Sequence, residues 1–320
     1  ILSGERGELG KALSRVGLEW PPNVSVRFIG LFDTVAGIVN LANLDLSPGN
    51  SRVNPVQLAL DPVKVGRAFH LVAMHEKRSN FSLNSLRYED GSLPENFSEI
   101  EIPGAHSDVG GGYADEMVED VLLHPTLVLR DSSVKWPSQT IEWDTLDSLR
   151  HHIKQEGWIG EFSLPLPDGA EPSLRVEQRR VPHPVPDGQV ELSLRMRRHV
   201  EAGYSKVSLR LMYDAAVNAG VPMFDLEQSD TDIQIPDDLE SVYMKINDSI
   251  TAGVESVTLE PPLNELVLQK YTHHSDHYNA METYVADTVV SYEFPLDMLH
   301  PFRSTFSRQR TIHLNGELEK

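Results

Sequence analysis

Two polar residues have the side chains and positions that acid–base catalysis requires. Asp33 follows the apolar run VSVRFIGLF at 24–32, and His106 lies in the glycine-rich stretch GAHSDVGGGY at 104–113. A carboxylate can orient an imidazole and stabilise its protonated form, while that imidazole takes the proton of a serine hydroxyl. Because the two residues lie far apart in the sequence, this chemistry requires a fold that brings them together.

The segments around both residues predict an α/β fold. The run 24–32 is typical of a buried strand, and residues 98–102 alternate polar and apolar side chains, as a second strand would. Between them, Asp61-Pro62 offers a helix start and apolar residues recur at helical spacing, which predicts a helix over 62–78. In such α/β architectures, catalytic groups gather at the carboxyl ends of the strands.

The order of the two residues fits a hydrolase triad. In α/β-hydrolases the acid precedes the histidine and the serine precedes both, so Asp33 is the candidate acid and His106 the candidate base. Alternatively, Asp33 caps a helix. Asp108 is either a second candidate acid or an organiser of the loop. Gly110, Gly111 and Gly112 predict a tight turn, with exposure of N–H groups to an oxyanion as the alternative.

Other polar clusters have candidate supporting roles. His75, Glu76 and Arg78 are expected on the helix at 62–78, where a buried ion pair or hydrogen bond that supports the active site is favoured over a metal site. The cluster His273, His274, Asp276 and His277 has the composition of a metal site, but no thiolate strengthens it. We therefore predict that the protein uses neither a metal nor another cofactor.

The composition is that of a folded, soluble protein without disulfides. Hydrophobic residues make up 40% and charged residues 24% of the 320 residues. The net charge of −20 repels phosphates and argues against a nucleic-acid partner. The absence of cysteine excludes thiolate metal sites and a cysteine nucleophile. The first ten residues lack a secretion-signal pattern, and no run of about 18 apolar residues predicts a membrane span.

The composition of the sequence changes after Arg130, where proline-rich and charged stretches separate the segments predicted to be helices or strands. We therefore divide the chain into 1–130, which carries the candidate acid and histidine, and 131–320, a mixed, helix-rich module whose late segments return to the core. The second part is a candidate lid or membrane-docking region. Helices are predicted over 145–156, 205–218 and 237–250, and short strands near 191–194 and 311–314.

Six strings of the sequence resemble one protein family. The strings RFIGLFDTVAGI (27–38), FHLVAMHEKRSNFSLNS (69–85) and IPGAHSDVGGGYAD (102–115) resemble the domain-of-unknown-function 2235 family, which includes bacterial type VI secretion phospholipase effectors of the Tle group. LRLMYDAAVNAGVP (209–222), YTHHSD (271–276) and RTIHLN (310–315) are also similar to it. The resemblance implies an α/β-hydrolase fold, of which this chain holds the C-terminal part of the sheet core, and a serine-type phospholipase or esterase with a Ser-Asp-His triad.

The triad's serine is not found in this sequence. The family's nucleophile elbow, of the form Gly-Phe-Ser-Arg-Gly-Ala, precedes the FDTV-type motif and does not occur here. Ser14 follows a stretch too polar for a buried strand and is expected on a helix surface, while Ser205 is expected at a helix start. We therefore expect the chain to be a fragment, or one piece of a cleaved or split enzyme, whose N-terminal segment brings the serine. The alternative is a degenerate relative that acts as a lipid- or protein-binding module.

The resemblance also implies where and on what such an enzyme acts. It would be made in the bacterial cytoplasm, exported without a signal peptide to the envelope or periplasm of a target cell, and act there as an antibacterial toxin. Membrane phospholipid would be its substrate. An immunity protein and a secretion spike protein would be its partners.

Overall fold

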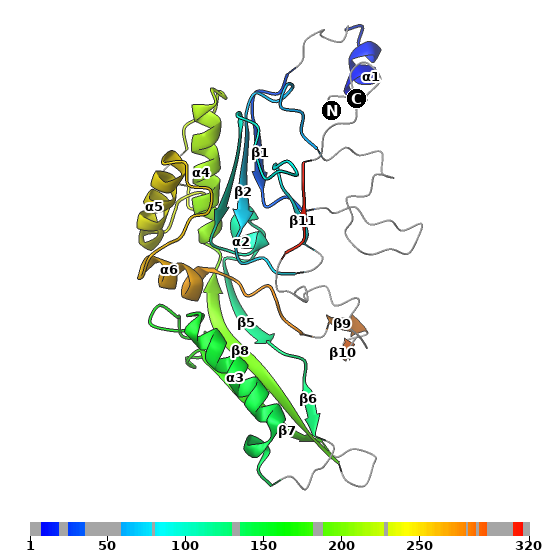
Figure 1. Cartoon of the computed structure of the whole chain (residues 1–320), viewed down its shortest axis with the longest axis vertical. Coiled ribbons are helices and arrows are strands. Elements are labelled where there is room, and N and C mark those ends of the chain that lie inside the picture. The colour runs from blue at the N-terminus through cyan, green and yellow to red at the C-terminus, as the bar shows by residue number, and fades with distance from the viewer. Residues whose placement is uncertain are drawn as a thin grey trace.

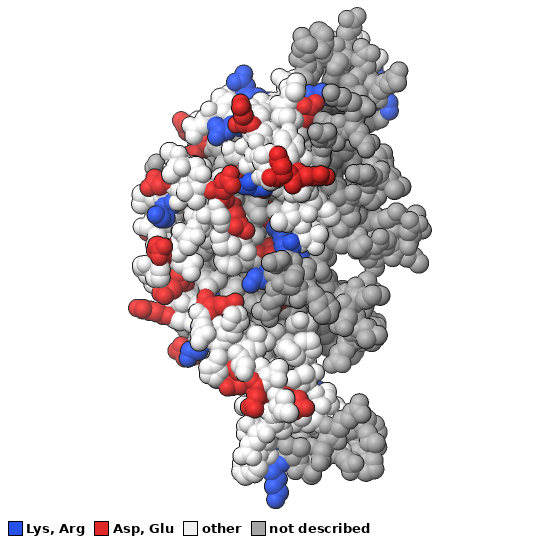
Figure 2. Space-filling model, in the orientation of Figure 1, with Lys and Arg blue, Asp and Glu red and all other residues white. Residues whose placement is uncertain are grey.

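The computed structural model describes residues 8–18, 25–35, 59–78, 81–129, 135–181, 188–226, 230–279, 281–285, 288–292 and 310–315. Figure 1 shows an elongated molecule in which two sheets lie one above the other, with helices α4 and α5 beside the upper sheet and α3 beside the lower one. Acidic side chains are spread over the face in Figure 2, interspersed with lysines and arginines, rather than gathered in one patch. None of the described helices is long and apolar enough to cross a membrane.

The upper sheet is parallel and has its central strand covered on both faces. It consists of β1 (Ile29–Phe32), β2 (Ala68–Ala73) and β4 (Phe97–Ile102), in the order β1-β2-β4. All six residues of β2 are buried. On one face its side chains pack against α4 (Tyr204–Asn218) and α5 (Glu240–Thr251) in the main hydrophobic core. Full burial of each large apolar side chain stabilises the fold by about 1.5–3 kcal/mol.

The helix predicted over 62–78 is wrong, because its central part is strand β2. Residues 62–64 form a turn in which the Val63 amide donates to Asp61 Oδ1 at 2.9 Å, so Asp61 starts a turn and not a helix. A strand buried on both faces is apolar throughout, and its apolar positions therefore also satisfy helical spacing. His75, Glu76 and Arg78 consequently lie in the loop after β2 and not on a helix.

The other predicted elements around the core are confirmed. The run 24–32 contains β1, although residue 24 lies outside the described residues, and the strand at 98–102 is β4. The helix at 205–218 is α4, and the one at 237–250 is a short 3-10 turn, η4 (Asp237–Leu239), followed by α5. The helix at 145–156 is α3 (Ile141–Gln155), which starts earlier because the Thr140 hydroxyl caps it by accepting from the Trp143 amide.

The lower sheet is antiparallel and is built on one long strand. The strand β8 (Gln189–Glu201) pairs with β5 (Glu116–Leu122), β6 (Leu127–Leu129) and β7 (Ser173–Val181), so the strand predicted at 191–194 is part of a longer one. Residues of β8 alternate between buried and partly exposed, and its apolar side chains share a second core with α3. Since β5 and β6 precede position 130 and β7 and β8 follow it, this sheet spans the predicted boundary.

A late segment of the chain returns to the upper sheet. The predicted strand at 311–314 corresponds to β11 (Ile312–His313), which runs parallel to β3 (Leu83–Asn84). Figure 1 shows β11, in red, beside the part of the fold that holds β1 and β2. The remaining elements are α1 (Glu8–Arg15), α2 (His106–Gly110), η3 (Pro137–Gln139), α6 (Leu263–Leu266), η5 (Val267–Tyr271), β9 (Met281–Val285) and β10 (Thr288–Tyr292).

The two candidate serines lie on helices, as predicted. Ser14 is exposed on α1. Ser205 lies in the first turn of α4, where its hydroxyl donates to the carbonyl oxygen of Ala202 at 3.0 Å. Neither serine therefore lies at a strand-to-helix elbow.

Candidate active site

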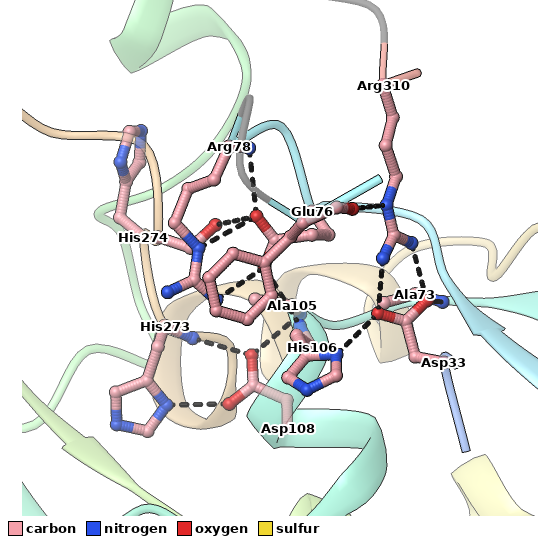
Figure 3. A network of polar contacts seen from close by, with 12 residues as sticks. Asp33, Ala73, Glu76, Arg78, Ala105, His106, Asp108, His273, His274 and Arg310 are labelled. Carbon is pink, nitrogen blue, oxygen red and sulfur yellow. Dashed lines mark hydrogen bonds and ion pairs between the residues drawn. The ribbon is translucent and has the colours of Figure 1, made fainter. Parts of the chain in front are cut away.

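The parallel sheet brings Asp33 and His106 together. Asp33 follows the last residue of β1, and His106 is the first residue of α2, which begins shortly after β4 ends. Because β1 and β4 are parallel to β2, their carboxyl ends lie at the same edge of the sheet. There His106 Nδ1 lies 2.8 Å from Asp33 Oδ2, a contact drawn in Figure 3. The two residues thus form an acid–imidazole pair.

The carboxylate of Asp33 is buried and surrounded by donors. Its Oδ1 accepts from the Ala73 amide at 2.9 Å, and the guanidinium of Arg310 binds both oxygens, at 2.5 and 2.8 Å. Burial alone would raise the pKa of Asp33, but the hydrogen bonds from His106 and Arg310, the charge of Arg310 and the Ala73 amide lower it to about 2. Asp33 also has a positive φ of 42°, a conformation that side chains other than glycine adopt at a cost. The carboxylate is therefore held as an anion.

This ionised state predicts a pH dependence of stability. Because the pKa of Asp33 is lower in the folded protein than its ordinary value of 3.8, the folded state binds fewer protons than the unfolded state between about pH 4 and pH 2. The stabilisation from Asp33 is present above pH 4, and about 2 kcal/mol of it is lost as the pH falls through that window. Urea denaturation at pH 2–6 should show this loss in the wild type and not in Asp33→Asn.

The exposed carboxylate Asp232 provides the control for this measurement. The variant Asp232→Asn should keep the wild-type slope between pH 4 and pH 2. A difference in free energy of unfolding between wild type and Asp33→Asn that stays constant from pH 6 to pH 2 would contradict the lowered pKa.

The imidazole of His106 is oriented by contacts on several sides. Because an ionised carboxylate can only accept, Nδ1 donates its proton to Asp33, and Nε2 is then the basic nitrogen. The ring of Phe81 meets the imidazole edge to face at a centroid distance of 4.9 Å, and the guanidinium of Arg78 lies 3.5 Å from the centre of that ring. Nε2 points away from Asp33 in Figure 3, and the side chain is 25% exposed. This geometry suits proton transfer at Nε2.

Glu76 and Arg78 form the predicted buried ion pair, although in a loop. Arg78 Nη2 lies 2.7 Å from Glu76 Oε2, and the second oxygen of Glu76 accepts from Arg78 Nε at 2.9 Å. Glu76 Oε2 also accepts from the backbone amide of His106 at 3.3 Å. The pair therefore anchors the start of α2. No group of three or more His, Cys, Asp or Glu side chains among the described residues is arranged to hold a metal.

Asp108 organises the loop, as one of its two predicted roles requires. Its Oδ2 accepts from the amides of Ala105 at 2.8 Å and His273 at 2.9 Å, while Oδ1 lies 2.6 Å from His273 Nδ1. These contacts tie α2 to the segment after η5. Asp108 contacts His273 and not His106, so it is not the acid of the pair around His106. Full burial is the main influence on Asp108 and raises its pKa.

The glycines after His106 lie where α2 ends. Gly110 ends α2, and Gly111 and Gly112 have positive φ angles of 79° and 125°, which favour glycine. These angles let the chain leave α2 in a conformation that other residues adopt only at a cost, and the tight turn itself stays a prediction.

Comparisons with known proteins identify what this chain resembles. Residues 13–136 match the family described as type VI secretion system phospholipase effector Tle1-like, catalytic domain. The structure of the Tle1 effector bound to the VgrG spike of the type 6 secretion system has a TM-score of 0.67 and 25% identity to this chain, covering 91% of this chain and 58% of that chain. A crystal structure of an uncharacterized protein from Pseudomonas aeruginosa has a TM-score of only 0.32 at 18% identity, over 78% of this chain and 24% of that chain. None of the curated proteins matches the sequence.

Asp33 and His106 both lie within the matched range. The match to the Tle1-like catalytic domain covers residues 13–136, less than half of the chain. The resemblance inferred from the sequence is thereby confirmed, together with the mixed arrangement of sheets and helices that the chain shares with the Tle1 effector. The chain spans 58% of the length of that effector.

A further buried histidine–carboxylate pair, next to Asp33, escaped prediction. His70 on β2 lies with Nδ1 3.1 Å from Glu99 Oε2 on β4, while its Nε2 accepts from the Thr34 amide at 3.0 Å. Burial would raise the pKa of Glu99, but hydrogen bonds from His70, the Leu86 amide and Ser85 lower it. The pair therefore fixes the backbone of Thr34, the residue after Asp33. The histidine within the apolar run AFHLVA could have indicated this pair, because a buried imidazole needs hydrogen-bond partners.

His75 and Arg310 complete the surroundings of the candidate site. His75 Nδ1 accepts from the Gly104 amide at 3.0 Å, and burial, together with the charge of Lys77, lowers the pKa of His75 to about 4. His75 is thus a neutral acceptor that holds the turn before His106. Arg310 belongs to the string RTIHLN, which the sequence comparison used, but nothing in that string indicated its pairing with Asp33.

Proposed function

We propose that this chain supplies the acid and the base of a serine-type phospholipase that cleaves carboxylic esters of glycerophospholipids by a Ser-Asp-His triad. The observation that carries the proposal is the 2.8 Å contact between His106 Nδ1 and buried Asp33, with Nε2 directed away from the carboxylate. The family match supports the phospholipase class, because the family is described as phospholipase effectors.

Each member of the triad has one role in the proposed reaction. The serine oxygen attacks the ester carbonyl carbon while His106 Nε2 takes the hydroxyl proton, and Asp33 stabilises the resulting imidazolium. The same proton then passes to the leaving alcohol oxygen as its bond to the carbonyl carbon breaks, and the fatty acyl group stays on the serine. Water, deprotonated by His106, releases the fatty acid and restores the serine. These steps need no metal or cofactor.

The serine of the proposed triad lies outside these 320 residues. Among the described strands, β1 is paired only with β2, so its second edge is available to a further strand. A parallel strand added there would end at the same edge of the sheet as Asp33 and His106. A serine in the turn after that strand would then lie on the side of the site toward which an α/β-hydrolase elbow points. In this proposal, the chain holds the C-terminal part of an α/β-hydrolase core.

The biological setting follows from the same relatives. The solved Tle1 effector is bound to a VgrG spike, and we propose a spike protein as a partner of this protein as well. The proposal of an antibacterial effector also includes an immunity protein in the producing cell and, as the substrate, membrane phospholipid of a target bacterium. The part of the chain after 130 would then provide a lid or docking surface.

A serine-reactive fluorophosphonate tests this mechanism on the protein encoded by the complete gene. We expect the probe to label one serine in a Gly-x-Ser-x-Gly string upstream of this chain, and to abolish release of fatty acid from phosphatidylglycerol and phosphatidylethanolamine vesicles. Activity should persist after removal of divalent ions with a chelator, since the triad needs none.

The alternative is a lipid- or protein-binding module without catalysis. Vesicle binding without fatty acid release, and without labelling of any serine, would favour that module and overturn the proposed enzyme. Activity that a chelator removes and added metal restores would instead indicate a metal-dependent hydrolase.

A further inference from the structure

One charged residue at the site has no role in the proton transfers described above. Arg310 binds Asp33 with both terminal nitrogens, Nη1 at 2.5 Å and Nη2 at 2.8 Å, and its side chain is only 8% exposed. A planar guanidinium that pairs with both oxygens of a carboxylate restricts the rotation of that carboxylate. Figure 3 shows Arg310 approaching Asp33 from the side away from Asp108.

The backbone that follows Arg310 is held by hydrogen bonds to the strand β3 and its neighbour Ser85. The Leu83 amide donates to the Thr311 carbonyl at 2.9 Å, and the Ser85 amide donates to the His313 carbonyl at 2.8 Å, which aligns β11 with β3. Arg310 Nε also donates to the carbonyl oxygen of Phe81, the residue whose ring packs against His106. Arg310 is thus bound to the acid and to the backbone of a residue that contacts the base.

The end of this segment is fastened to the body of the domain as well. The Asn315 amide donates to the Arg87 carbonyl, and the Asn315 side-chain oxygen accepts from the Leu60 amide at 2.9 Å. The segment 310–315 is therefore anchored along its length, and the position of the guanidinium is set by the fold and not by a free side chain.

The positive charge of Arg310 acts on His106 through a shared atom. Arg310 Nη2 and His106 Nδ1 each lie 2.8 Å from the same oxygen, Asp33 Oδ2, so the two nitrogens are at most about 5.6 Å apart. A like charge at this distance disfavours protonation of the imidazole. Asp33 acts in the opposite direction.

The other charges around His106 are already paired. Glu76, which accepts from the His106 amide, is paired with Arg78, whose guanidinium lies over the Phe81 ring. Asp108 on α2 is bound by His273. Within the described residues, Asp33 contacts the imidazole directly, and Arg310 binds the same carboxylate oxygen.

We propose that Arg310 is a positioning residue for the acid–base pair, which fixes the Asp33 carboxylate and offsets its charge so that His106 serves as a base at a lower pH. This inference rests on the proposed function. Without Arg310, the unopposed carboxylate would hold the protonated imidazole more strongly, and the enzyme would need a higher pH to work.

The test compares Arg310→Gln, which removes the charge, with Arg310→Lys, which keeps it without the planar fork, in the protein encoded by the complete gene. We expect the acid side of the pH profile of kcat/KM to move up by about one pH unit in Arg310→Gln and by less in Arg310→Lys. Arg179→Gln is the matched control, because Arg179 is exposed on β7 and pairs with Glu191. Its profile should match the wild type.

Thermal unfolding shows whether each variant is folded. NMR of the histidine side chains then reports on His106 even in a variant that is less stable. In the folded Arg310→Gln protein, the Nδ1–H signal of His106 should shift relative to the wild type, which it should not do in Arg179→Gln. Profiles and NMR signals of Arg310→Gln that match the wild type would overturn the inference. Failure of the proposed function itself looks different: the wild type would then lack esterase activity, while the NMR comparison would still report whether Arg310 acts on His106.

Discussion

Replacing His106 by alanine is expected to lower the release of fatty acid from phospholipid vesicles by at least about 10⁴-fold. The variant removes the nitrogen that takes the serine proton, and within the described residues no other imidazole contacts Asp33. Because the His106 side chain is partly exposed, its loss should leave the fold intact. The measurement is kcat/KM on vesicles at the pH optimum, together with the melting temperature of each variant.

The matched control is His152→Ala. His152 lies on α3 with a 59% exposed side chain and pairs only with Glu156. Its replacement should change activity less than twofold. If His106→Ala kept more than a hundredth of the wild-type activity with an unchanged melting temperature, His106 would not be the base.

Replacing Arg198 by methionine is expected to lower the free energy of unfolding by about 3–5 kcal/mol, the largest stability effect that the structure predicts. Arg198 on β8 is fully buried and donates to Glu119 at 2.8 Å and to the Leu268 carbonyl at 3.0 Å, with a further hydrogen bond to the Thr272 carbonyl. It also donates to the Trp158 carbonyl at 3.4 Å, so its removal leaves a buried carboxylate and three carbonyl oxygens without this donor. Urea denaturation measures the loss.

The consequence should extend to the active site. Glu119 accepts from the His274 amide at 2.8 Å, and the adjacent His273 binds Asp108 on α2. Arg198 thus links the lower sheet to the segment that fastens the helix of His106. Hydrogen exchange at the amides of 272–275 should therefore become faster in Arg198→Met.

Two further variants distinguish the effect of breaking the buried ion pair from the general effect of removing an arginine. Arg195→Met removes a neighbouring arginine of β8 that pairs with Asp120 on the exposed side, and should cost no more than about 1 kcal/mol. Arg198→Met combined with Glu119→Leu should recover part of the lost stability, because no buried charge is then left unpaired. A loss below 1 kcal/mol in Arg198→Met alone would show that the pair does not hold the two regions together.

Local sequence patterns predicted the elements that have one buried face and one solvent-exposed face. The helices α3, α4 and α5 each have an apolar face and a solvent face, and cap or stop residues such as Thr140 and Gly220 mark their ends. The strand β2 was predicted as a helix because both of its faces are covered, which removes the alternation that identifies a strand. The strands β5 and β7 escaped prediction because charged residues interrupt their apolar positions.

By itself, the sequence was enough to predict the candidate acid and the candidate base. Asp33 at the end of an apolar run and His106 in a glycine-rich stretch were identifiable because the chain order of acid and histidine and the local motifs are properties of the primary structure. Only the tertiary structure decided their partners. Arg310 reaches Asp33 across 277 positions, and His273 reaches Asp108 across 165, because the pairing of β11 with β3 and the packing of the segment after η5 bring them there. Such contacts depend on how strands and segments pack, which no spacing of residues along the chain records.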